Sequence, residues 1–258
     1  MLQAIRQDIR SAVSPVEWAA RGELAALYRI VHRYGMVDLI YNHITLKVPG
    51  THDQFLVNPY GLSYDEITAS SLLKIDGEGT ILLQPDHGYG INYTGFVIHG
   101  AVHAARPEIH CIAHTHTRAG TAVSAMACGL LPLSQSSMRF HRNIGYHDFE
   151  GFALNLEERE RLIKNLGDHD NLILRNHGLL ACGRSVAQTF VNLHQLEMVC
   201  RAQIDMMASG TELHQPDDAA IEASRAVLDR LRFSGNDGRL EWAAQLRWLE
   251  RNHPDYLG

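Results

Sequence analysis

Apolar side chains recur at helical spacing near the beginning of the chain. The pattern covers residues 15–35 and ends at Gly35, a residue type that commonly terminates helices. Its apolar members are Trp18, Leu24, Leu27, Ile30 and Val31. A stripe of this kind faces the interior of a protein, so we predict a helix that packs one side against the core.

The next segment contains short apolar runs in place of a helical stripe. These runs cover residues 44–48, 55–58, 72–75 and 80–83. Turn-forming residues separate them, as in Pro59-Tyr60-Gly61. Short apolar runs bounded by turns are typical of β-strands, and we predict one strand for each run.

Strands and helices alternate in the remainder of the chain. Further strands are predicted at residues 110–116, 171–174 and 179–182. Further helices are predicted at residues 96–105, 119–127, 185–209, 217–233 and 239–251. This alternation is typical of a layered α/β architecture. No internal repeat, low-complexity segment or linker interrupts it, so we predict a single domain over residues 1–258.

Charge and hydropathy exclude two classes of partner. The chain has 258 residues and a net charge of −6, and its Lys and Arg residues form no block or stripe. Nucleic-acid-binding proteins normally concentrate positive charge on one face. No apolar run approaches the roughly 20 residues that span a bilayer. We therefore expect neither a nucleic acid nor a membrane as a partner.

The four cysteines indicate the compartment. Cys111, Cys128, Cys182 and Cys200 form no C-x-x-C pair, and three of them are flanked by apolar residues, as buried free thiols are. The N-terminus also lacks the charged and apolar regions of a signal peptide. Both features favour a cytoplasmic protein.

A pair of histidines at the end of a predicted strand suggests a metal site. His114 and His116 stand two residues apart, so in a strand their side chains point to the same face. A catalytic zinc site typically has three protein ligands and one open position. The best third candidate is His177, followed by Gly178, which we expect to supply an unusual backbone angle at a turn. Taken alone, the pair is more often an ordinary strand face, because sixteen histidines produce such pairs by chance.

Longer motifs around these histidines resemble the class II aldolase/adducin family. The stretch Thr94-Gly95-Phe96-Val97-Ile98-His99-Gly100-Ala101-Val102-His103-Ala104-Ala105-Arg106-Pro107-Glu108-Ile109, followed by His114-Thr115-His116, carries the resemblance. So do Asn58-Pro59-Tyr60-Gly61-Leu62, Gly145-Tyr146-His147-Asp148 and Leu172-Ile173-Leu174-Arg175-Asn176-His177-Gly178. The motifs keep their order from about residue 24 to residue 210, and they are most similar to the adducin-like branch.

The resemblance implies a fold, an assembly and a metal site. It implies a three-layer α/β/α domain with a central, mainly antiparallel sheet, followed here by C-terminal helices at 217–253, and a homotetramer. By matching motifs, it implies that His114, His116 and His177 bind a divalent metal ion. Zinc is our first choice of metal, with iron or manganese as alternatives. It implies a structural role for His99.

The same resemblance implies a substrate pocket. Asn42 resembles the asparagine of the family's phosphate-binding turn, and Gly61 falls in a loop that often borders the pocket. Thr94 is the hydroxyl that remains where two serines often hold a substrate phosphate. A C-terminal tyrosine reaches a neighbouring subunit's active site in some family aldolases, and Tyr256 is the corresponding candidate.

One departure from the family pattern changes the expected chemistry. The family's aldolases use a glutamate as general base four residues before the histidine that matches His99, and Gly95 stands there. Glycine cannot accept the substrate's hydroxyl proton, as a retro-aldol reaction requires. Decarboxylation of a keto or hydroxy acid needs an electron-withdrawing metal but no such base. We expect Tyr146, His103 or a bound water to supply the later proton.

Three functions stay open on this basis. The first is a divalent-metal-dependent carbon–carbon lyase, of decarboxylase or aldolase type, on a small hydroxy or keto carbonyl substrate. The second is a non-catalytic, adducin-like assembly module. The third is a non-haem iron oxygenase, which ranks last because such enzymes usually combine two histidines with one carboxylate.

Overall fold

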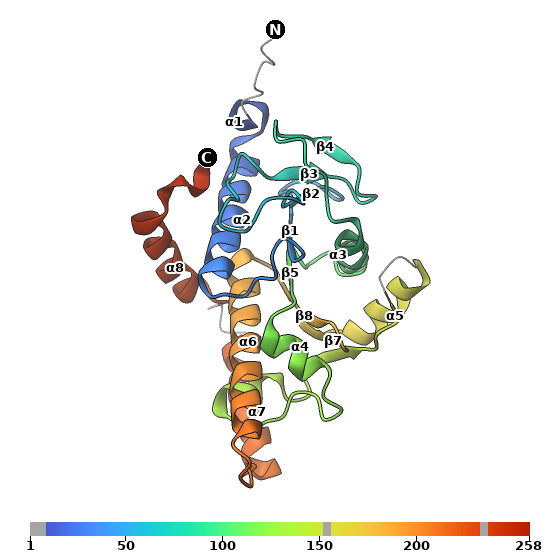
Figure 1. Ribbon diagram of the computed structural model, residues 1–258, viewed down its shortest axis with the longest axis vertical. Coiled ribbons are helices and arrows are strands. Elements are labelled where there is room, and N and C mark those ends of the chain that lie inside the picture. The colour runs from blue at the N-terminus through green and yellow to red at the C-terminus, as the bar shows by residue number, and fades with distance from the viewer. Residues whose placement is uncertain (1–8, 152–155, 233–236) are drawn as a thin grey trace.

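An eight-stranded sheet separates two layers of helices in the computed structural model, which describes residues 9–151, 156–232 and 237–258 (Figure 1). The strands are β1 (His43–Lys47), β2 (Phe55–Val57), β3 (Leu73–Ile75), β4 (Ile81–Leu83), β5 (Cys111–Thr115), β6 (Gly145–His147), β7 (Asn171–Leu174) and β8 (Gly178–Gly183). Their order across the sheet is β4-β3-β2-β1-β5-β8-β7-β6. Within the described residues, β6 and β7 pair in parallel and all other neighbours pair antiparallel. The expected mainly antiparallel sheet is confirmed.

Helices cover both faces of this sheet, as the resemblance implied. On one face lie α2 (Pro15–Arg33) and α6 (Val186–Ala208), with α8 (Arg239–Asn252) packed outside them, and on the other lie α3 (Tyr93–Ala105) and α5 (Leu156–Leu166) (Figure 1). The smaller elements are α1 (Ile9–Ala12), α4 (Arg118–Ser124), η1 (Gln135–Phe140), α7 (Asp218–Arg232) and η2 (Pro254–Leu257).

Alternation along the central strands divides the core into two halves. In β1, Ile44 and Leu46 pack with the α2 layer, and Thr45 between them bonds to the α3 layer. In β5, Cys111 and Ala113 join the α2 layer and Ile112 joins the α3 layer. Successive strand residues point to opposite faces, so His43 and His114 belong to the α3 side of the sheet. This alternation determines the face of the sheet on which the candidate site lies.

A buried tyrosine fixes the beginning of β1. The hydroxyl of Tyr28, on α2, accepts the backbone N–H of Ile44 at 2.9 Å and that of Asn58 at 3.2 Å, and it donates to the carbonyl of Ile44. Tyr28 is fully buried. Hydrogen bonds to two strands hold the helix and the sheet in register, and they hold His43 in place next to Ile44.

The sequence predicted most elements with small errors at their ends. The strand predicted at 110–116 runs from Cys111 to Thr115, so His116 lies just beyond it. Five of the described elements were not predicted: α1, η1, β6, α5 and η2. β6 has three residues, too few to display an alternating pattern.

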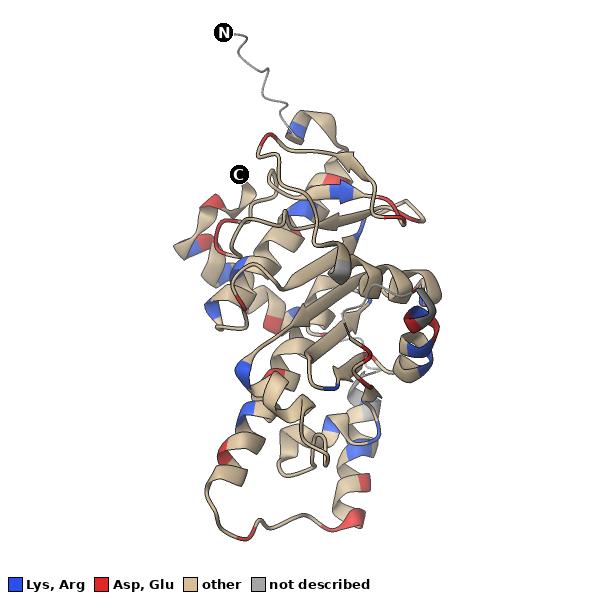
Figure 2. Ribbon diagram, turned by 45° about the vertical axis from the view of Figure 1, so that its right-hand side comes forward, with Lys and Arg blue, Asp and Glu red and all other residues tan. Residues whose placement is uncertain are grey.

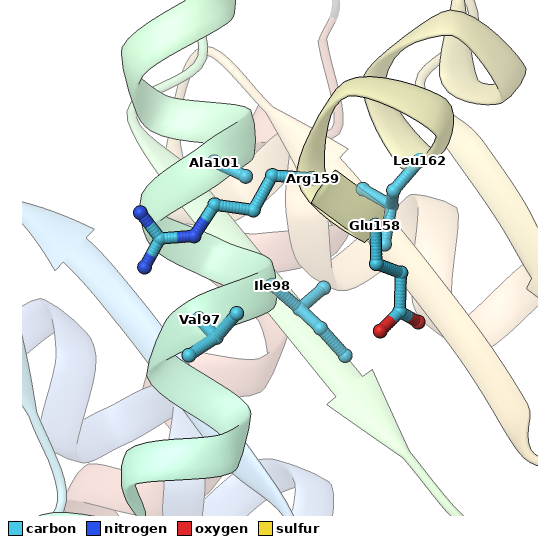
Figure 3. Close-up of a pocket in the computed structure, with 6 residues that line it drawn as sticks. All are labelled: Val97, Ile98, Ala101, Glu158, Arg159 and Leu162. Atoms are coloured by element: carbon cyan, nitrogen blue, oxygen red, sulfur yellow. The ribbon is translucent and has the colours of Figure 1, made fainter. Parts of the chain in front are cut away.

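A small pocket and the distribution of charge mark the helical layers. α5 lies against α3 and leaves a small pocket lined by Val97, Ile98, Ala101, Glu158, Arg159 and Leu162 (Figure 3). Figure 2 shows basic and acidic positions interspersed along the outer helices, while most of the sheet carries neither. Among the described helices, none is long and apolar enough to cross a membrane.

Candidate metal centre

Three histidine side chains meet where β5 ends and β8 begins. His114 lies near the end of β5, His116 follows two residues later, and His177 immediately precedes β8. The antiparallel register places Thr115 opposite Leu179. The turn before β8 therefore reaches the end of β5, and residues far apart in the sequence come together there.

The turn that presents His177 depends on two unusual positions. Asn176 adopts a left-handed backbone with a φ of 57°, a conformation that asparagine tolerates better than most residues. We expected Gly178 to supply that angle, and this was wrong. A Cβ atom on Gly178 would lie 2.3 Å from the carbonyl oxygen of Thr115, so glycine is needed for the close approach of β8 to β5.

The three imidazoles converge through the same ring atom. Nε2 of His114 lies 2.7 Å from Nε2 of His116 and 3.2 Å from Nε2 of His177. Nε2 of His116 lies 2.9 Å from Nε2 of His177. These three form a group of potential metal ligands within the described part of the chain. The expected three-histidine cluster is present.

Hydrogen bonds on the opposite sides of the rings decide which nitrogens carry a proton. Nδ1 of His114 lies 2.9 Å from the carbonyl oxygen of Leu179, which can only accept, so the hydrogen sits on Nδ1. Nδ1 of His116 lies 3.3 Å from a carboxylate oxygen of Asp38, with the same consequence. In neutral rings both Nε2 atoms then carry exposed lone pairs.

This arrangement fits a divalent metal ion. Two lone pairs 2.7 Å apart repel each other unless a cation or proton lies between them. Neutral imidazole nitrogens are good ligands for zinc, iron and copper. Hydrogen bonds from ligand histidines to a carbonyl and a carboxylate are the usual outer contacts of such sites. The donor atoms and their outer partners therefore match what a metal requires.

Burial keeps these rings neutral. It lowers the pKa of His177 to about 4, with the neighbouring His116 adding to the effect. Burial is also the main cause that lowers the pKa of His114 and of His116, although Asp38 opposes it for His116. Metal ligands must be deprotonated, so the site is prepared for binding at neutral pH.

Asp38 owes its position to Asn42. The side-chain oxygen of Asn42 accepts the backbone N–H of Asp38 at 2.5 Å, which closes the loop before β1. Asn42 is fully buried. Its bonding thus organises the loop that carries the carboxylate against His116, and Asn42 contributes to the centre through Asp38.

Comparison with known proteins places this geometry in a family. The Class II Aldolase and Adducin N-terminal domain matches residues 22–204. The chain belongs to the class II aldolase and adducin family. A crystal structure of an aldolase II superfamily protein from Pseudomonas syringae is 46% identical with a TM-score of 0.93, over 97% of this chain and 99% of that one.

Two further relatives represent the two sides of the family. The L-fuculose 1-phosphate aldolase from Glaciozyma antarctica PI12 is 25% identical with a TM-score of 0.82, over 93% of this chain and 92% of that chain. Alpha-adducin of Mus musculus is 46% identical over 190 residues, which are 73% of this chain and 26% of that protein. The chain is therefore similar both to an aldolase and to part of an adducin.

A second set of buried histidines lies beside the three ligands. The ring of His43 lies with its centroid 5.1 Å from that of His114 and 4.3 Å from that of His99. Thr45 joins two more members of the set, because its hydroxyl lies 2.8 Å from Nδ1 of His99 and 2.9 Å from Nε2 of His103. The rings of His43, His99 and His103 thus lie between β1 and α3, next to the three converging histidines.

The contacts of His103 explain its burial. Its Nδ1 lies 3.2 Å from the carbonyl oxygen of Ile109 and its Nε2 bonds to Thr45, so both ring nitrogens have partners. Burial lowers its pKa to about 3. Among the described contacts, none joins His103 to one of the three converging rings, and it acts on the site through Thr45 and His99.

Tyr146, the other expected proton donor, has its described contacts with Leu130 and Arg175. Its hydroxyl accepts the backbone N–H of Leu130 at 3.0 Å, and the guanidinium of Arg175 lies 4.4 Å from its ring centroid. Burial raises the pKa of Tyr146. These contacts tie β6 to the loop at residue 130.

The structure describes the remaining expected positions to different extents. Gly61 lies against the ring of Tyr89, and a Cβ atom there would come within 2.6 Å of it. Thr94 lies in the first turn of α3, and its side chain lies outside the described part of the structure. Tyr256 is 8% exposed and packs with the α2 core.

Sequence reasoning missed two residues of the centre, Asp38 and His43. Asp38 lies in a loop without periodicity, and nothing in the sequence links it to His116. His43 did have a signal, because it immediately precedes the strand predicted at 44–48 and follows Asn42. That signal became informative once the register His43↔His114 was known.

Proposed function

We propose that this protein is a divalent-metal-dependent carbon–carbon lyase, of decarboxylase or aldolase type, acting on a small hydroxy or keto carbonyl substrate. One observation carries the proposal: the unprotonated Nε2 atoms of His114 and His116 converge with Nε2 of His177. A divalent ion held there would act as a Lewis acid that withdraws electrons from a carbonyl oxygen. Membership of the family and the similarity to an L-fuculose 1-phosphate aldolase support this chemistry over other uses of a metal.

Decarboxylation suits this chain better than the retro-aldol reaction. Residue 95 is glycine, so it offers no carboxylate to take a hydroxyl proton. In decarboxylation the carbon–carbon bond breaks, carbon dioxide leaves, and the electron pair stays with the remaining carbon until a proton arrives. No described hydrogen bond joins Tyr146 or His103 to the three converging rings, so we assign that proton to water on the open side of His116, whose side chain is 22% exposed.

Zinc is the metal we propose first, with iron or manganese as alternatives. Non-haem iron oxygenases usually place one carboxylate oxygen among the ligands. Asp38 lies on Nδ1 of His116, away from the converging Nε2 atoms, so it cannot serve as that third ligand without a rearrangement. This position of Asp38 argues against the oxygenase alternative.

Assembly and compartment complete the proposal. We propose a homotetramer, as the resemblance implies, and light scattering on the purified protein tests it. We propose a cytoplasmic location because all four cysteines are free and three of them are buried.

A non-catalytic, adducin-like assembly module is the competing function, supported by the similarity to alpha-adducin.

Metal analysis separates the two functions. The full-length protein is purified without added metal, and its metal content is measured by mass spectrometry before and after reloading with zinc. The test variant combines His114→Ala with His116→Ala. The control is His52→Ala, which removes an exposed histidine in the loop after β1.

We expect about one ion per chain in the wild type and in His52→Ala, and almost none in the double variant. Reloaded wild-type protein should then release carbon dioxide from a panel of small keto and hydroxy acids. Wild-type protein that retains no metal after reloading would contradict the lyase and leave the assembly module as the better explanation.

A further inference from the structure

His43 lies directly beside the metal centre although it is not one of the three converging ligands. Its position opposite His114 in the antiparallel register puts both side chains on the same face of the sheet. The two ring centroids are 5.1 Å apart, and His43 is 4% exposed. The first residue of β1 therefore contributes a fourth imidazole to the inner side of the centre.

The ring of His43 occupies space that Gly95 leaves free. A Cβ atom built on Gly95 would lie 1.9 Å from Nε2 and 2.0 Å from Cδ2 of His43. Both distances are far shorter than any tolerable contact, so a side chain at residue 95 and the ring of His43 exclude each other. The first turn of α3 is held in place by Asn92, whose side chain accepts the N–H of Gly95, so the helix backbone does not yield easily.

Two ring nitrogens in this space have no hydrogen-bond partner among the described residues. They are Nδ1 of His43 and Nε2 of His99, and both are buried. The state of His99 follows from its neighbours. His103 donates from Nδ1 to the carbonyl of Ile109, so its Nε2 accepts the hydroxyl hydrogen of Thr45.

The oxygen of Thr45 then accepts from Nδ1–H of His99. Nε2 of His99 is left as an unpaired acceptor at the edge of His43, with the two rings in a T-shaped contact at 4.3 Å. Buried polar atoms without partners are rare and are tolerated mainly where a ligand or a reaction uses them. The inner side of the centre is thus prepared to receive a polar group.

The charge of the groups around the candidate metal site differs from that of a site with a carboxylate at residue 95. An imidazole is neutral or positive and never negative. The three ligands are also imidazoles, and the carboxylate of Asp38 lies behind His116 on Nδ1. A divalent cation in these surroundings keeps most of its positive charge, and it therefore attracts anionic oxygen ligands more strongly than neutral ones.

We propose that His43 is a substrate-contacting residue, and that its imidazole, standing where a carboxylate at residue 95 would stand, selects substrates that bring a carboxylate of their own, such as small 2-oxo or 2-hydroxy acids. This inference rests on the proposed metal-dependent lyase function. It goes further, because it assigns the recognition of the substrate's carboxylate to one residue of β1.

Binding of oxalate to the zinc-loaded, full-length protein tests the proposal without relying on turnover. Oxalate presents carboxylate oxygens to the site, and dihydroxyacetone is the uncharged comparison. Calorimetry should give at least tenfold tighter binding of oxalate than of dihydroxyacetone. The test variant is His43→Glu, with His43→Gln as the neutral variant and His52→Glu as the matched charge control in an exposed loop.

We expect His43→Glu to weaken oxalate binding at least tenfold, while His43→Gln weakens it less than His43→Glu does. His52→Glu should change it less than twofold. Zinc content should stay at the wild-type level in all three variants, because His43 is not one of the three ligands. Cobalt-substituted protein provides a check, since its visible spectrum should be the same in His43→Gln and wild type before oxalate is added.

A second pair of variants covers the case in which His43→Glu does not fold. Gly95→Glu combined with His43→Ala places a carboxylate in the same space from α3, and it should bind oxalate at least tenfold more weakly than His43→Ala alone. Gly95→Ala alone should lower the melting temperature, and His43→Ala should reverse that loss in the double variant.

Equal effects of His43→Glu and His52→Glu on oxalate binding would overturn the inference and leave the metal-dependent lyase intact. So would a zinc-loaded wild type that binds oxalate no more tightly than dihydroxyacetone. Wild-type protein that takes up no zinc would instead overturn the proposed function, and the inference with it.

Discussion

Two adjoining groups of buried histidines use the same side chain in opposite ways. In the ligand group, His114, His116 and His177, the three Nε2 atoms point at one another from distances of 2.7 to 3.2 Å. In the α3 group, Thr45 bridges His99 and His103, and the carbonyl of Ile109 completes the chain. Lone pairs converge in the first group, whereas donors meet acceptors in most of the second.

This contrast shows that partners, and not residue type, decide what a buried histidine does. A carbonyl or carboxylate on Nδ1 leaves Nε2 unprotonated, and several such atoms aimed at one point create a place for a cation. A hydroxyl between two rings uses those lone pairs internally and produces a packed polar core. His43 lies between the groups and shares features of both, since it is buried like the second and adjoins the first.

Acid should affect both groups at once, and we expect the largest effect here. Burial lowers the pKa of His177 to about 4 and the pKa values of His43 and His103 to about 3. The unfolded chain binds these protons near the ordinary pKa of about 6.5. Stability is therefore complete above pH 6.5 and falls as the pH drops toward 4 and then 3.

Urea unfolding of metal-free protein at pH 7, 6, 5 and 4 measures this loss. Added zinc should make the decline steeper, because zinc needs unprotonated ligands. A free energy of unfolding that stays constant from pH 7 to pH 5 would show that these rings are not held neutral by the fold.

The next largest expected effect is the loss of zinc-dependent stabilisation, which should occur when a residue of the ligand group is replaced and not when another histidine is. His177→Ala should abolish the stabilisation that zinc confers, which is about 2.7 kcal/mol at a zinc concentration a hundred times the dissociation constant. For a chain of this length the corresponding fall in melting temperature is about 5–10 °C. Calorimetric melts with and without zinc measure it, with His52→Ala as the control. A zinc-dependent shift that persists in His177→Ala would remove His177 from the ligand set.

Thr45→Val tests the α3 group. Valine keeps the shape of threonine but leaves ring nitrogens of His99 and His103 without their shared partner. The cost should be about 1–3 kcal/mol in the free energy of unfolding. Zinc content should not change, because the ligand group does not use Thr45. If Thr45→Val loses zinc while remaining folded, the two groups are more closely coupled than their hydrogen bonds indicate.

Asp38→Asn should give the smallest effect, confined to the affinity for the metal. The carboxylate of Asp38 orients His116 from behind, and its side chain is 43% exposed, so the fold does not depend on it. Loss of such an outer partner typically weakens metal binding about tenfold to a hundredfold. Zinc titration against a competing chelator measures the change, and thermal melting without zinc should be close to that of the wild type. An unchanged zinc affinity would mean that His116 is oriented by other contacts.

Much of the fold could be predicted because it depends on local patterns. The apolar stripe of residues 15–35 and the short runs around 44–48 and 55–58 correspond to α2, β1 and β2. The elements that escaped prediction are α1, η1, β6, α5 and η2, and all but α5 have six residues or fewer, too few to display a repeating pattern. The resemblance of longer motifs to the family supplied the three-layer architecture with a mainly antiparallel sheet, and it indicated the three converging histidines.

The sequence by itself determined which residue types can form a metal centre, and its longer motifs, which resemble the class II aldolase/adducin family, indicated the fold. Only the tertiary structure decided which nitrogen of each ring is free, since Leu179 and Asp38 reach the rings from other elements. It also decided that His43 fills the space beside Gly95, because the pairing of β1 with β5 and the packing of α3 on the sheet meet at that point. Contacts between distant segments arise from packing in three dimensions, and no local pattern in the chain encodes them.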